Sequence, residues 1–326
     1  MSVLVYIENA EGKFKKSALE IISFANAIAT KMGLPLSAVS IGNVEAEELQ
    51  KASQYGATRI LTVNNEKLKE INPQAYASVL AEAAKSEKAK VIVMTAGFTG
   101  KSIAPRIAVK LDASLGENLV DLPQMEGSNF IVRKGAFSGK AFSQVNLLGE
   151  IKVLSMLPNS FKVVENPVKA EIVKFEAEIS DKDFTARITE TVRSTDKVSL
   201  PEAELVVSAG RGLKGPENWK MIEDLANVIG AATACSKPVS DAGWRPHSEH
   251  VGQTGIAISP NLYIAIGISG AIQHLAGVSS SKVIVVINKD PEAPFFKAAD
   301  YGIVGDAFEV VPELIKSAKE FMSNQN

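Results

Sequence analysis

The sequence is poor in the residues on which covalent catalysis and metal binding most often depend. Its 326 residues include a single cysteine, Cys235, and only three histidines. One cysteine excludes an internal disulfide and any metal site built from several thiolates, and it favours a reducing compartment. We expect Cys235 to be a small buried residue at the end of a strand rather than a reactive thiol.

The sequence also lacks an excess of either charge. Lys and Arg number 35 and Asp and Glu number 37, so the formal net charge is -2. No run of like charge marks a binding patch, which argues against nucleic acid as a partner. The first residues resemble a strand, without the features of a signal or transit peptide. This pattern predicts a cytoplasmic bacterial protein, and a processed mitochondrial chain would have the same pattern.

One long uncharged segment, Val251–Gly277, lacks the continuity of a membrane span. Gln253, Pro260, Asn261 and several glycines interrupt it. A spanning helix needs about 20 mainly apolar residues in one run. We therefore expect short strands joined by turns, and no membrane insertion.

What the sequence does contain is an alternation of strands and helices. Apolar residues make up 46% of the chain, enough for two cores. In the first half, predicted strands at 3–8, 36–42, 59–64 and 90–97 alternate with predicted helices at 17–31, 44–56, 74–85 and 103–112. Such alternation predicts a parallel sheet covered on both faces.

The pattern changes between residues 128 and 192. Segments 129–148, 152–158 and 170–179 predict short antiparallel strands. The polar segment 193–201, which ends in proline, is the predicted linker between an N-terminal domain, 1–192, and a C-terminal domain, 202–326.

Strands and helices alternate again beyond the linker. Strands are predicted at 204–210, 231–236, 262–268 and 282–290, and helices at 216–230 and 313–322. The predicted fold class is therefore α/β, with two doubly wound parallel-sheet domains, of which the C-terminal one is Rossmann-like.

The clearest motif is GRGLKG, from Gly210 to Gly215. It follows a predicted strand and precedes a predicted helix, as in dinucleotide-binding loops. Backbone N–H groups there can meet a phosphate, and Arg211 adds a cation. The next strand ends in residues 235–237, CSK, without the acidic residue that contacts the ribose of NAD. A tight turn without a ligand remains the alternative.

A second strand-turn-helix pattern, GISGAIQH, spans residues 267–274. Two such turns in one sheet predict an elongated ligand with several phosphates, laid across the carboxyl ends of the strands. His274 by itself would be interpreted as a buried core residue. Beside these turns it is a candidate hydrogen-bond donor to a redox ring.

The segment between the two turns, residues 236–255, is long and polar, and such loops are typically functional or disordered. Asp241, His247, Glu249 and His250 lie in it, but their spacing matches no closed zinc pattern, so we predict no metal site. The sequence has no nucleophile elbow and no Walker A motif, so we predict no catalytic residue. An NAD(P)-dependent dehydrogenase and a non-redox nucleotide-binding module remain open at this stage.

Several longer stretches together resemble the α subunit of electron transfer flavoprotein. They are SAGRGLK (208–214), SDAGW (240–244), VGQTG (251–255), LYIAIGISGAIQHLAG (262–277), INKDPEAPFFKAADYGIVGD (287–306) and VVPEL (310–314). The N-terminal domain matches more loosely, through TAGFTGKSIAPRIAVKLD (95–112).

The resemblance implies a heterodimer with a β subunit that the N-terminal domain contacts, and FAD in the C-terminal domain. Such a carrier takes electrons from flavin dehydrogenases, such as the acyl-CoA dehydrogenases of fatty acid β-oxidation, and passes them to a membrane quinone oxidoreductase. It turns over no substrate of its own. Some relatives bifurcate electrons with a second flavin in the β subunit, and that alternative stays open.

The resemblance also implies the FAD contacts. Val251, Gly252, Gln253 and Thr254 would meet the isoalloxazine ring. Ser269, Gly270, Ala271, Ile272, Gln273 and His274 would bind the pyrophosphate and the ring. The remaining contacts would be Arg211 and Ser236, with Asn288 and Asp306 on the adenosine side. Lys237 stands where the family usually has an arginine over the ring, which predicts a shifted flavin potential because Lys lacks the planar fork.

Overall fold

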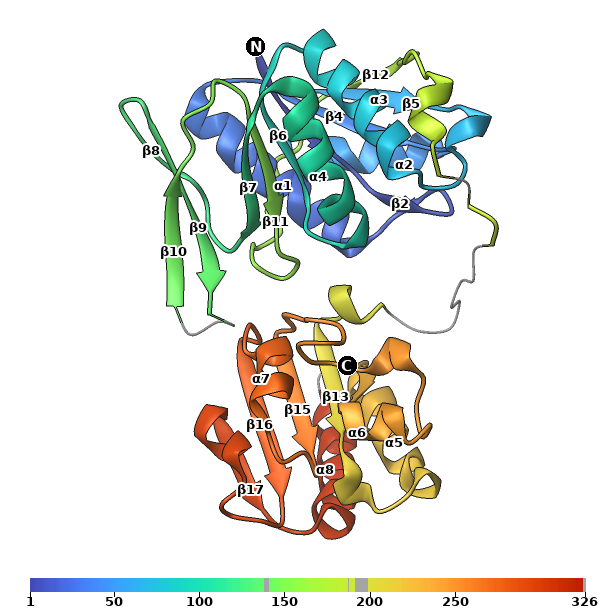
Figure 1. Cartoon of the computed structure of the whole chain (residues 1–326), viewed down its shortest axis with the longest axis vertical. Helices are drawn as coiled ribbons and strands as arrows, with labels where there is room; N and C mark the ends of the chain where they lie inside the picture. The colour runs from blue at the N-terminus through green and yellow to red at the C-terminus, as the bar shows by residue number, and fades with distance from the viewer. Residues whose placement is uncertain (138–140, 187, 191–198, 325–326) are drawn as a thin grey trace. The chain divides into compact units, whose positions relative to one another are not determined.

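The computed structural model describes residues 1–137, 141–186, 188–190 and 199–324. The chain divides into two compact units (Figure 1). The first comprises Met1–Gly135 and Phe142–Arg193, and the second comprises Ala136–Ala141 and Ser194–Asn326.

A large sheet forms the centre of the first unit. Its strands, in sheet order, are β10 (Ala141–Asn146), β9 (Asn129–Ala136), β7 (Ser114–Leu119), β11 (Lys152–Met156), β6 (Ala89–Thr95), β1 (Ser2–Tyr6), β4 (Leu36–Ile41), β5 (Arg59–Val63) and β12 (Glu171–Lys174), and β8 (Gln124–Glu126) pairs with β9. Every pair from β7 to β12 is parallel, whereas β9 is antiparallel to β7 and to β8. A short hairpin pairs β2 (Asn9–Ala10) with β3 (Lys13–Phe14).

Helices cover both faces of this sheet, as the alternation in the sequence predicts. Val3 and Val5 of β1 pack into one core with α1, and Leu4 and Tyr6 pack into another with α3 and α4. Successive residues of a strand point to opposite faces, so a strand buried on both sides is apolar throughout. The helices are α1 (Lys16–Met32), α2 (Ala46–Lys51), α3 (Pro73–Ser86) and α4 (Phe98–Leu111).

The predicted antiparallel pairing between residues 128 and 192 is wrong for two strands. β11 lies between β7 and β6 and is parallel to both, and β12 is parallel to β5 at the sheet edge. β10 ends at Asn146 and β11 begins at Lys152, yet β11 pairs with β7 and β6 rather than with β10, and β12 pairs with the distant β5. Local sequence patterns do not reveal such non-sequential pairing. β7 was not predicted from the sequence, because its residues SLGENL are only partly apolar.

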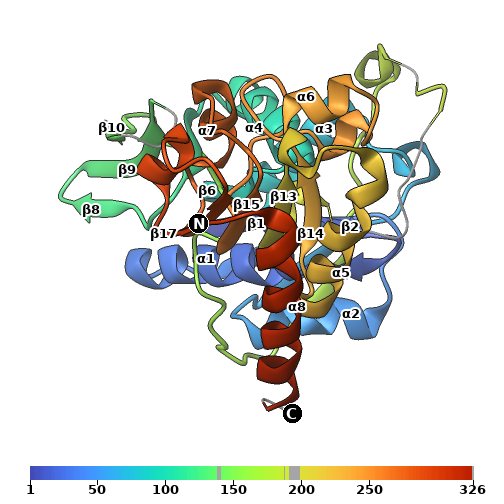
Figure 2. The same ribbon diagram turned by 90° about the horizontal axis from the view of Figure 1, so that it is seen from below.

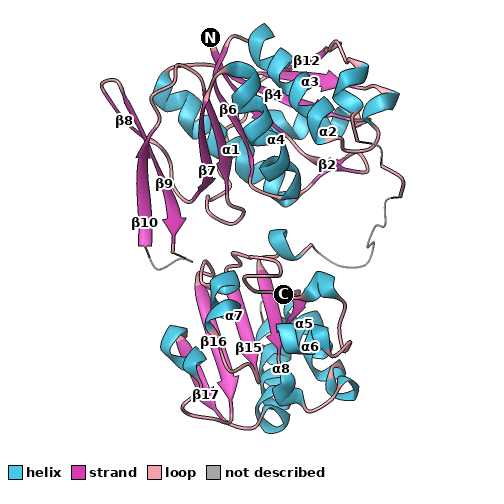
Figure 3. Ribbon diagram, in the orientation of Figure 1, coloured by secondary structure: helices cyan, strands magenta, loops and turns pink. Residues whose placement is uncertain are grey.

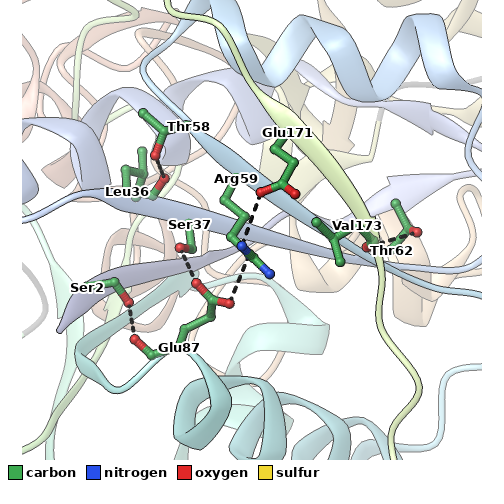
Figure 4. A network of polar contacts seen from close by, with 9 residues as sticks. All are labelled: Ser2, Leu36, Ser37, Thr58, Arg59, Thr62, Glu87, Glu171 and Val173. Atoms are coloured by element: carbon green, nitrogen blue, oxygen red, sulfur yellow. Dashed lines mark hydrogen bonds and ion pairs between the residues drawn. The ribbon is translucent and has the colours of Figure 1, made fainter.

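Polar contacts fix β12 at the edge of the sheet (Figure 4). The guanidinium of Arg59, on β5, pairs with Glu171 of β12 at 3.1 Å and with Glu87 at 3.3 Å. Glu87 also accepts a hydrogen bond from the Ser37 hydroxyl at 2.7 Å. One arginine therefore joins β5, β12 and the end of α3.

The second unit contains a five-stranded sheet that is parallel throughout. Its order is β14 (Ala232–Cys235), β13 (Leu205–Ala209), β15 (Leu262–Ile266), β16 (Val283–Asn288) and β17 (Tyr301–Val304). The chain crosses from β14 over β13 to β15, so the order reverses between β13 and β15. This is the order of doubly wound nucleotide-binding folds, and it confirms the predicted fold class.

Two layers of helices cover the second sheet (Figure 3). α5 and α8 pack against one face in a core with Val207 and Ile266, while α7 packs against the other face in a core with Val206 and Tyr263. α5 and α8 lie side by side on their face (Figure 2). The helices are α5 (Lys220–Ile229), α6 (Lys237–Asp241), α7 (Ile272–Val278) and α8 (Ala307–Ser323).

α5 illustrates why these sequences become helices. Ile222, Leu225 and Ala226 are buried and lie on one face at the spacing of an amphipathic helix. Gly230 ends the helix in the left-handed conformation, with φ of 69°. Burying a leucine or isoleucine side chain contributes about 1.5–3 kcal/mol, so packing rather than propensity stabilises this helix.

Most predicted elements agree with the structure to within a few residues. The predicted helix at 103–112 begins earlier, at Phe98, and the predicted helix at 216–230 begins as a 3-10 turn, Pro216–Asn218. Residues 193–198 of the predicted linker lie outside the described residues, and a 3-10 turn, Leu200–Glu202, follows them. None of the helices in the described ranges is long and apolar enough to cross a membrane.

Candidate functional site

The carboxyl ends of the second unit's strands gather nearly all of the sequence-predicted site residues. β13 is followed by Arg211, β14 by Ser236, and β15 by Ser269, while Asn288 ends β16. Because the order of the sheet reverses between β13 and β15, the helices that follow these two strands, α5 and α7, pack on opposite faces of the sheet. Ligands of open parallel sheets bind in the crevice formed at that point.

Glycines let the loops after β13 and β15 approach each other at this point. The N–H of Gly212 donates to the carbonyl of Gly267 at 3.1 Å, and a Cβ on Gly212 would lie 2.6 Å from the Cα of Gly267. Gly267 has φ of 61°, in the left-handed region that glycine adopts at little cost. The two glycine-rich patterns of the sequence are therefore one structural feature, a contact between two turns.

Arg211 lies exposed in the 3-10 turn Arg211–Leu213. Lys214 follows with φ of 68°, and its ammonium lies 3.8 Å from Asp306 and 4.6 Å from the centre of the Phe308 ring. The crevice therefore has cations on the β13 side, where an anionic ligand would be attracted.

Asn288 and Asp306 already have partners within the chain. Asn288 donates to the carbonyl of Ile268 at 3.0 Å and accepts from the N–H of Asp290 at 3.1 Å. Asp306 caps α8 by accepting from the N–H of Phe308 at 3.0 Å. Both residues thus hold the ends of β16 and α8 in place beside the crevice.

The loop Val251–Gly255 is fixed by its backbone. The N–H of Val251 donates to Cys235 at the end of β14, and the N–H of Gln253 donates to the carbonyl of Gln273 on α7 at 2.7 Å. Gly252 has φ of 152°, and a Cβ there would lie 3.2 Å from that same carbonyl. The side chains of Gln253 and Thr254 remain exposed. The loop therefore presents polar groups from a rigid backbone.

The turn after β15, like the loop Val251–Gly255, contains a tightly packed glycine and exposed neighbouring residues. Gly270, with φ of 84°, packs so closely on Phe295 that a Cβ would lie 2.5 Å from it. Ser269, Ala271, Ile272 and Gln273 are exposed around this turn. Two tight turns thus present accessible backbone and side-chain groups on either side of the crevice.

His274 is buried where α7 faces the sheet. Its Nε2 lies 2.8 Å from the hydroxyl of Tyr263 on β15. Its Nδ1 is buried without a hydrogen-bond partner in the described part of the chain. Burial first, and then neighbouring His250, lower the pKa of His274 to about 4, against a smaller opposing effect of the Val251 backbone. His274 is therefore neutral at pH 7, and one of its ring nitrogens is buried without a partner among the described residues.

Ser236 and Lys237 follow β14. Ser236 is buried, and its N–H donates to the carbonyl of Ala209 at 3.1 Å. The ammonium of Lys237 pairs with Asp241, one turn later on α6, at 2.8 Å, and both side chains are more than half exposed. Lys237 is therefore held by its own helix in this structure.

Cys235, at the end of β14, is fully buried, which confirms its predicted place. Burial raises the pKa of its thiol to about 12. The thiolate is therefore a negligible fraction at neutral pH, and the residue is a small core side chain.

Arg245, which was not among the residues predicted from the sequence, holds the polar segment 236–255 together. Its guanidinium makes two hydrogen bonds to Glu249, at 2.7 and 2.6 Å, and one to Glu223 of α5 at 3.1 Å. It also lies 5.3 Å from the centre of the Trp219 ring. Glu249 thus pairs with an arginine, and no group of metal-ligating side chains occurs among the described residues.

An open parallel sheet with glycine turns on both sides of its reversal point defines a dinucleotide-binding α/β protein. Comparison with known proteins makes this class specific. Residues 3–180 match the family model of the electron transfer flavoprotein domain, and residues 199–279 match that of the electron transfer flavoprotein FAD-binding domain.

Curated relatives match over nearly the whole chain. The chain is 38% identical to electron transfer flavoprotein subunit alpha of Thermoanaerobacterium thermosaccharolyticum, with 98% of each chain covered. It is 37% identical to the subunit alpha of Bacillus subtilis, covering 95% of this chain and 96% of that one. It is 34% identical to Protein FixB of Clostridium saccharobutylicum, covering 98% and 97%. The chain belongs to the electron transfer flavoprotein α-subunit family, and its cofactor is FAD.

The residues at the crevice fit this cofactor. FAD carries two phosphates and a flat ring edged with hydrogen-bond donors and acceptors. The crevice offers exposed Arg211, backbone turns kept free of side chains by Gly252 and Gly270, and the unpaired Nδ1 of His274. Its donors are neutral or cationic, as an anionic dinucleotide requires.

Proposed function

We propose that this chain is the FAD-bearing subunit of a heterodimeric electron carrier. It accepts electrons from flavin dehydrogenases, such as acyl-CoA dehydrogenases, and passes them to a membrane quinone oxidoreductase. The observation that carries the proposal is the unpaired, buried Nδ1 of neutral His274 beside two glycine turns. A carrier needs a site that binds and tunes a redox ring, and it needs no acid-base pair for a substrate.

The proposed ring contacts are the loop Val251–Thr254 and His274. FAD supplies the redox chemistry when bound, and the chain binds, orients and shields it. Gln253 and Thr254 present their exposed side chains from a backbone anchored to Cys235 and Gln273. Such donors stabilise negative charge on a bound group because they are already correctly oriented before that charge develops.

The proposed pyrophosphate contacts are Arg211 and the turn Ser269–Gln273. Ser236 is a further proposed FAD contact, and Lys237 is proposed to lie near the ring. Arg211 supplies a fork of donors that matches phosphate oxygens. Asn288 and Asp306 are the proposed contacts of the adenosine half. Since both already bond within the chain, we expect them to act mainly by holding β16 and α8 at the crevice.

We further propose that residues 1–192 contact the β subunit, that 193–201 is a linker, and that 202–326 is the FAD-binding domain. This division is supported by the two family models, which match residues 3–180 and 199–279 separately. We place the carrier in the bacterial cytoplasm, where single unpaired cysteines such as Cys235 remain reduced.

The proposal is tested by purifying the chain together with its β subunit, recording the visible absorption spectrum and reducing the complex stepwise. We expect one flavin per heterodimer, reduced by an acyl-CoA dehydrogenase with its substrate and reoxidised by a quinone oxidoreductase. Two flavins per heterodimer would indicate a bifurcating relative instead. Reduction by NAD(P)H and substrate without a partner protein would favour the dehydrogenase alternative, and a colourless complex after incubation with FAD would refute the carrier.

A further inference from the structure

A second buried histidine, His250, lies directly beneath the loop that carries the proposed ring contacts. Only 2% of its surface is exposed, and its Nδ1 has no hydrogen-bond partner among the described residues. Two facing glycines make room for its ring. A Cβ on Gly255 would lie 2.8 Å from Nδ1, and a Cβ on Gly252 would lie 3.4 Å from Nε2.

The backbone fixes this imidazole in place. The N–H of His250 donates to His247 at 3.0 Å, and its carbonyl accepts from Ile256 at 2.9 Å. The next residue, Val251, bonds to the end of β14. Gly252 lies between the two histidines. A Cβ on Gly252 would lie 3.4 Å from Nε2 of His250 and 3.6 Å from the Cα of His274. Two neutral imidazoles with unpaired ring nitrogens thus lie on either side of Gly252.

We propose that His250 is a proton-binding residue of the flavin site. When one electron enters the site from the donor dehydrogenase, the imidazole of His250 takes one proton from solvent and becomes imidazolium. When the electron leaves for the acceptor, the proton returns to solvent. The charge of the site is therefore unchanged overall. This inference rests on the proposed placement of the ring against Val251–Thr254.

The physical reason is that a new negative charge in a poorly solvated site stabilises a nearby cation. The pKa of His250 is lowered by burial first, and then by His247 and Lys237, while Asp241 raises it. His250 is therefore mainly neutral at pH 7 before reduction. His274, with a pKa of about 4 and its Nε2 against Tyr263, requires a much larger change to be protonated.

The other ionisable groups around His250 do not supply the positive charge that would balance an added electron. Lys237 and Asp241 on α6 neutralise each other at 2.8 Å, and Glu249 is paired with Arg245. Cys235 on the adjacent strand is protonated. Among the described neighbours, His250 is thus the buried group whose charge is most readily changed near pH 7.

The test is the flavin midpoint potential of the FAD-loaded heterodimer between pH 5.5 and 8.5, compared with His250→Gln. Binding one proton per electron changes the reduction equilibrium up to tenfold per pH unit, which is about 59 mV for a one-electron couple. We expect part of this slope in the unaltered protein and its loss in His250→Gln. The comparison variant is His247→Gln, which keeps the His250 imidazole and should therefore retain the slope. Because His247 lowers the pKa of His250, we expect the slope in this variant to begin at higher pH rather than to disappear. An identical slope with and without the His250 imidazole overturns the proposal.

A direct measurement uses histidine-labelled protein, because this chain has only three histidines. The NMR signal lost in His250→Gln should titrate at higher pH in the reduced protein than in the oxidised protein. If His250→Gln does not fold, His247→Gln and His274→Gln assign the signal by elimination. The proposal is overturned if the His250 signal titrates at the same pH in the oxidised and the reduced protein. A His250 signal that is identical with and without bound FAD would also overturn the proposal, because it would show that the ring does not lie near His250. Failure of the heterodimer to bind FAD would instead refute the proposed carrier function.

Discussion

The hydroxyl of Tyr263 lies 2.8 Å from Nε2 of His274, and both side chains are buried. This contact connects the central strand β15 to α7 and fixes the orientation of the imidazole. It leaves Nδ1 as the ring nitrogen that has no partner among the described residues. Tyr263, within the apolar strand β15, thereby orients His274, the candidate ring contact predicted from the sequence.

Tyr263→Phe should therefore destabilise the second unit. Removing the hydroxyl leaves a buried ring nitrogen unsatisfied, which costs about 1–3 kcal/mol. Urea unfolding followed by circular dichroism measures the change. Tyr301→Phe is the control, because Tyr301 is 67% exposed on the edge strand and should have little effect. Equal stability of both variants would mean that the contact with His274 contributes nothing.

The stability of the FAD-free protein should fall as the pH drops from about 6.5 towards 4. The pKa of His274 is about 4 in the fold and near 6.5 when unfolded, so over this window the unfolded chain binds a proton that the folded chain does not. Stability from this group is present above the unfolded pKa and decreases by up to about 3 kcal/mol as the pH falls. His274→Gln should show a shallower decrease in urea unfolding at pH 7 and pH 5. A decrease as steep as in the unaltered chain would assign the effect to other groups.

His274→Ala should retain FAD but lower its midpoint potential. The variant removes the unpaired Nδ1 at the proposed ring site, and hydrogen bonds to charged groups contribute about 1.5–3 kcal/mol. Spectroelectrochemical titration of the heterodimer gives the potential, and the flavin-to-protein absorbance ratio gives occupancy. His274→Gln, which keeps a donor, should recover part of the potential. An unchanged potential in the alanine variant would show that His274 does not interact with the reduced ring.

Lys237→Arg should raise the flavin potential. Arginine presents a planar fork that can stack on a ring, whereas Lys237 is held by Asp241 on its own helix. Asp241→Asn releases the lysine without altering it, and we expect a smaller change in the same direction. Redox titration of the unaltered protein, Lys237→Arg and Asp241→Asn measures the three potentials. Equal potentials would mean that residue 237 lies away from the ring.

Gly267→Ala should weaken both the fold and FAD binding. A Cβ at this position would lie 2.8 Å from the backbone of Gly212, in addition to the strain of φ at 61°. Gly243→Ala isolates the strain, because Gly243 has φ of 71° but a Cβ there would meet no atom within 4 Å beyond its chain neighbours. We expect a loss of about 1 kcal/mol for Gly243→Ala, and a greater loss, with a raised FAD dissociation constant, for Gly267→Ala. Similar losses in both would show that the contact between the turns is easily relaxed.

The sequence by itself determined the elements and the loops that carry the candidate site. The continuous apolar run of β15 and the glycines after β13 and β15 follow from local chemistry, because buried parallel strands must be apolar and tight turns need glycine. The burial of Cys235 was predicted because a free cysteine at the end of a strand behaves as a small apolar residue, and the structure confirms it. The motifs also sufficed to indicate the family.

Only the tertiary structure decided which distant residues meet. β11 and β12 enter the first sheet as parallel strands although their sequences resemble hairpin strands, because pairing depends on where the chain enters the sheet and, for β12, on ion pairs such as Arg59 with Glu171. The orientation of His274 by Tyr263 likewise arises from packing between α7 and β15. The place of His250 beside Gly252 and Gly255 depends on the conformation of the loop that contains them. Strand order and side-chain packing bring such residues together, and neither leaves a periodic signal along the chain.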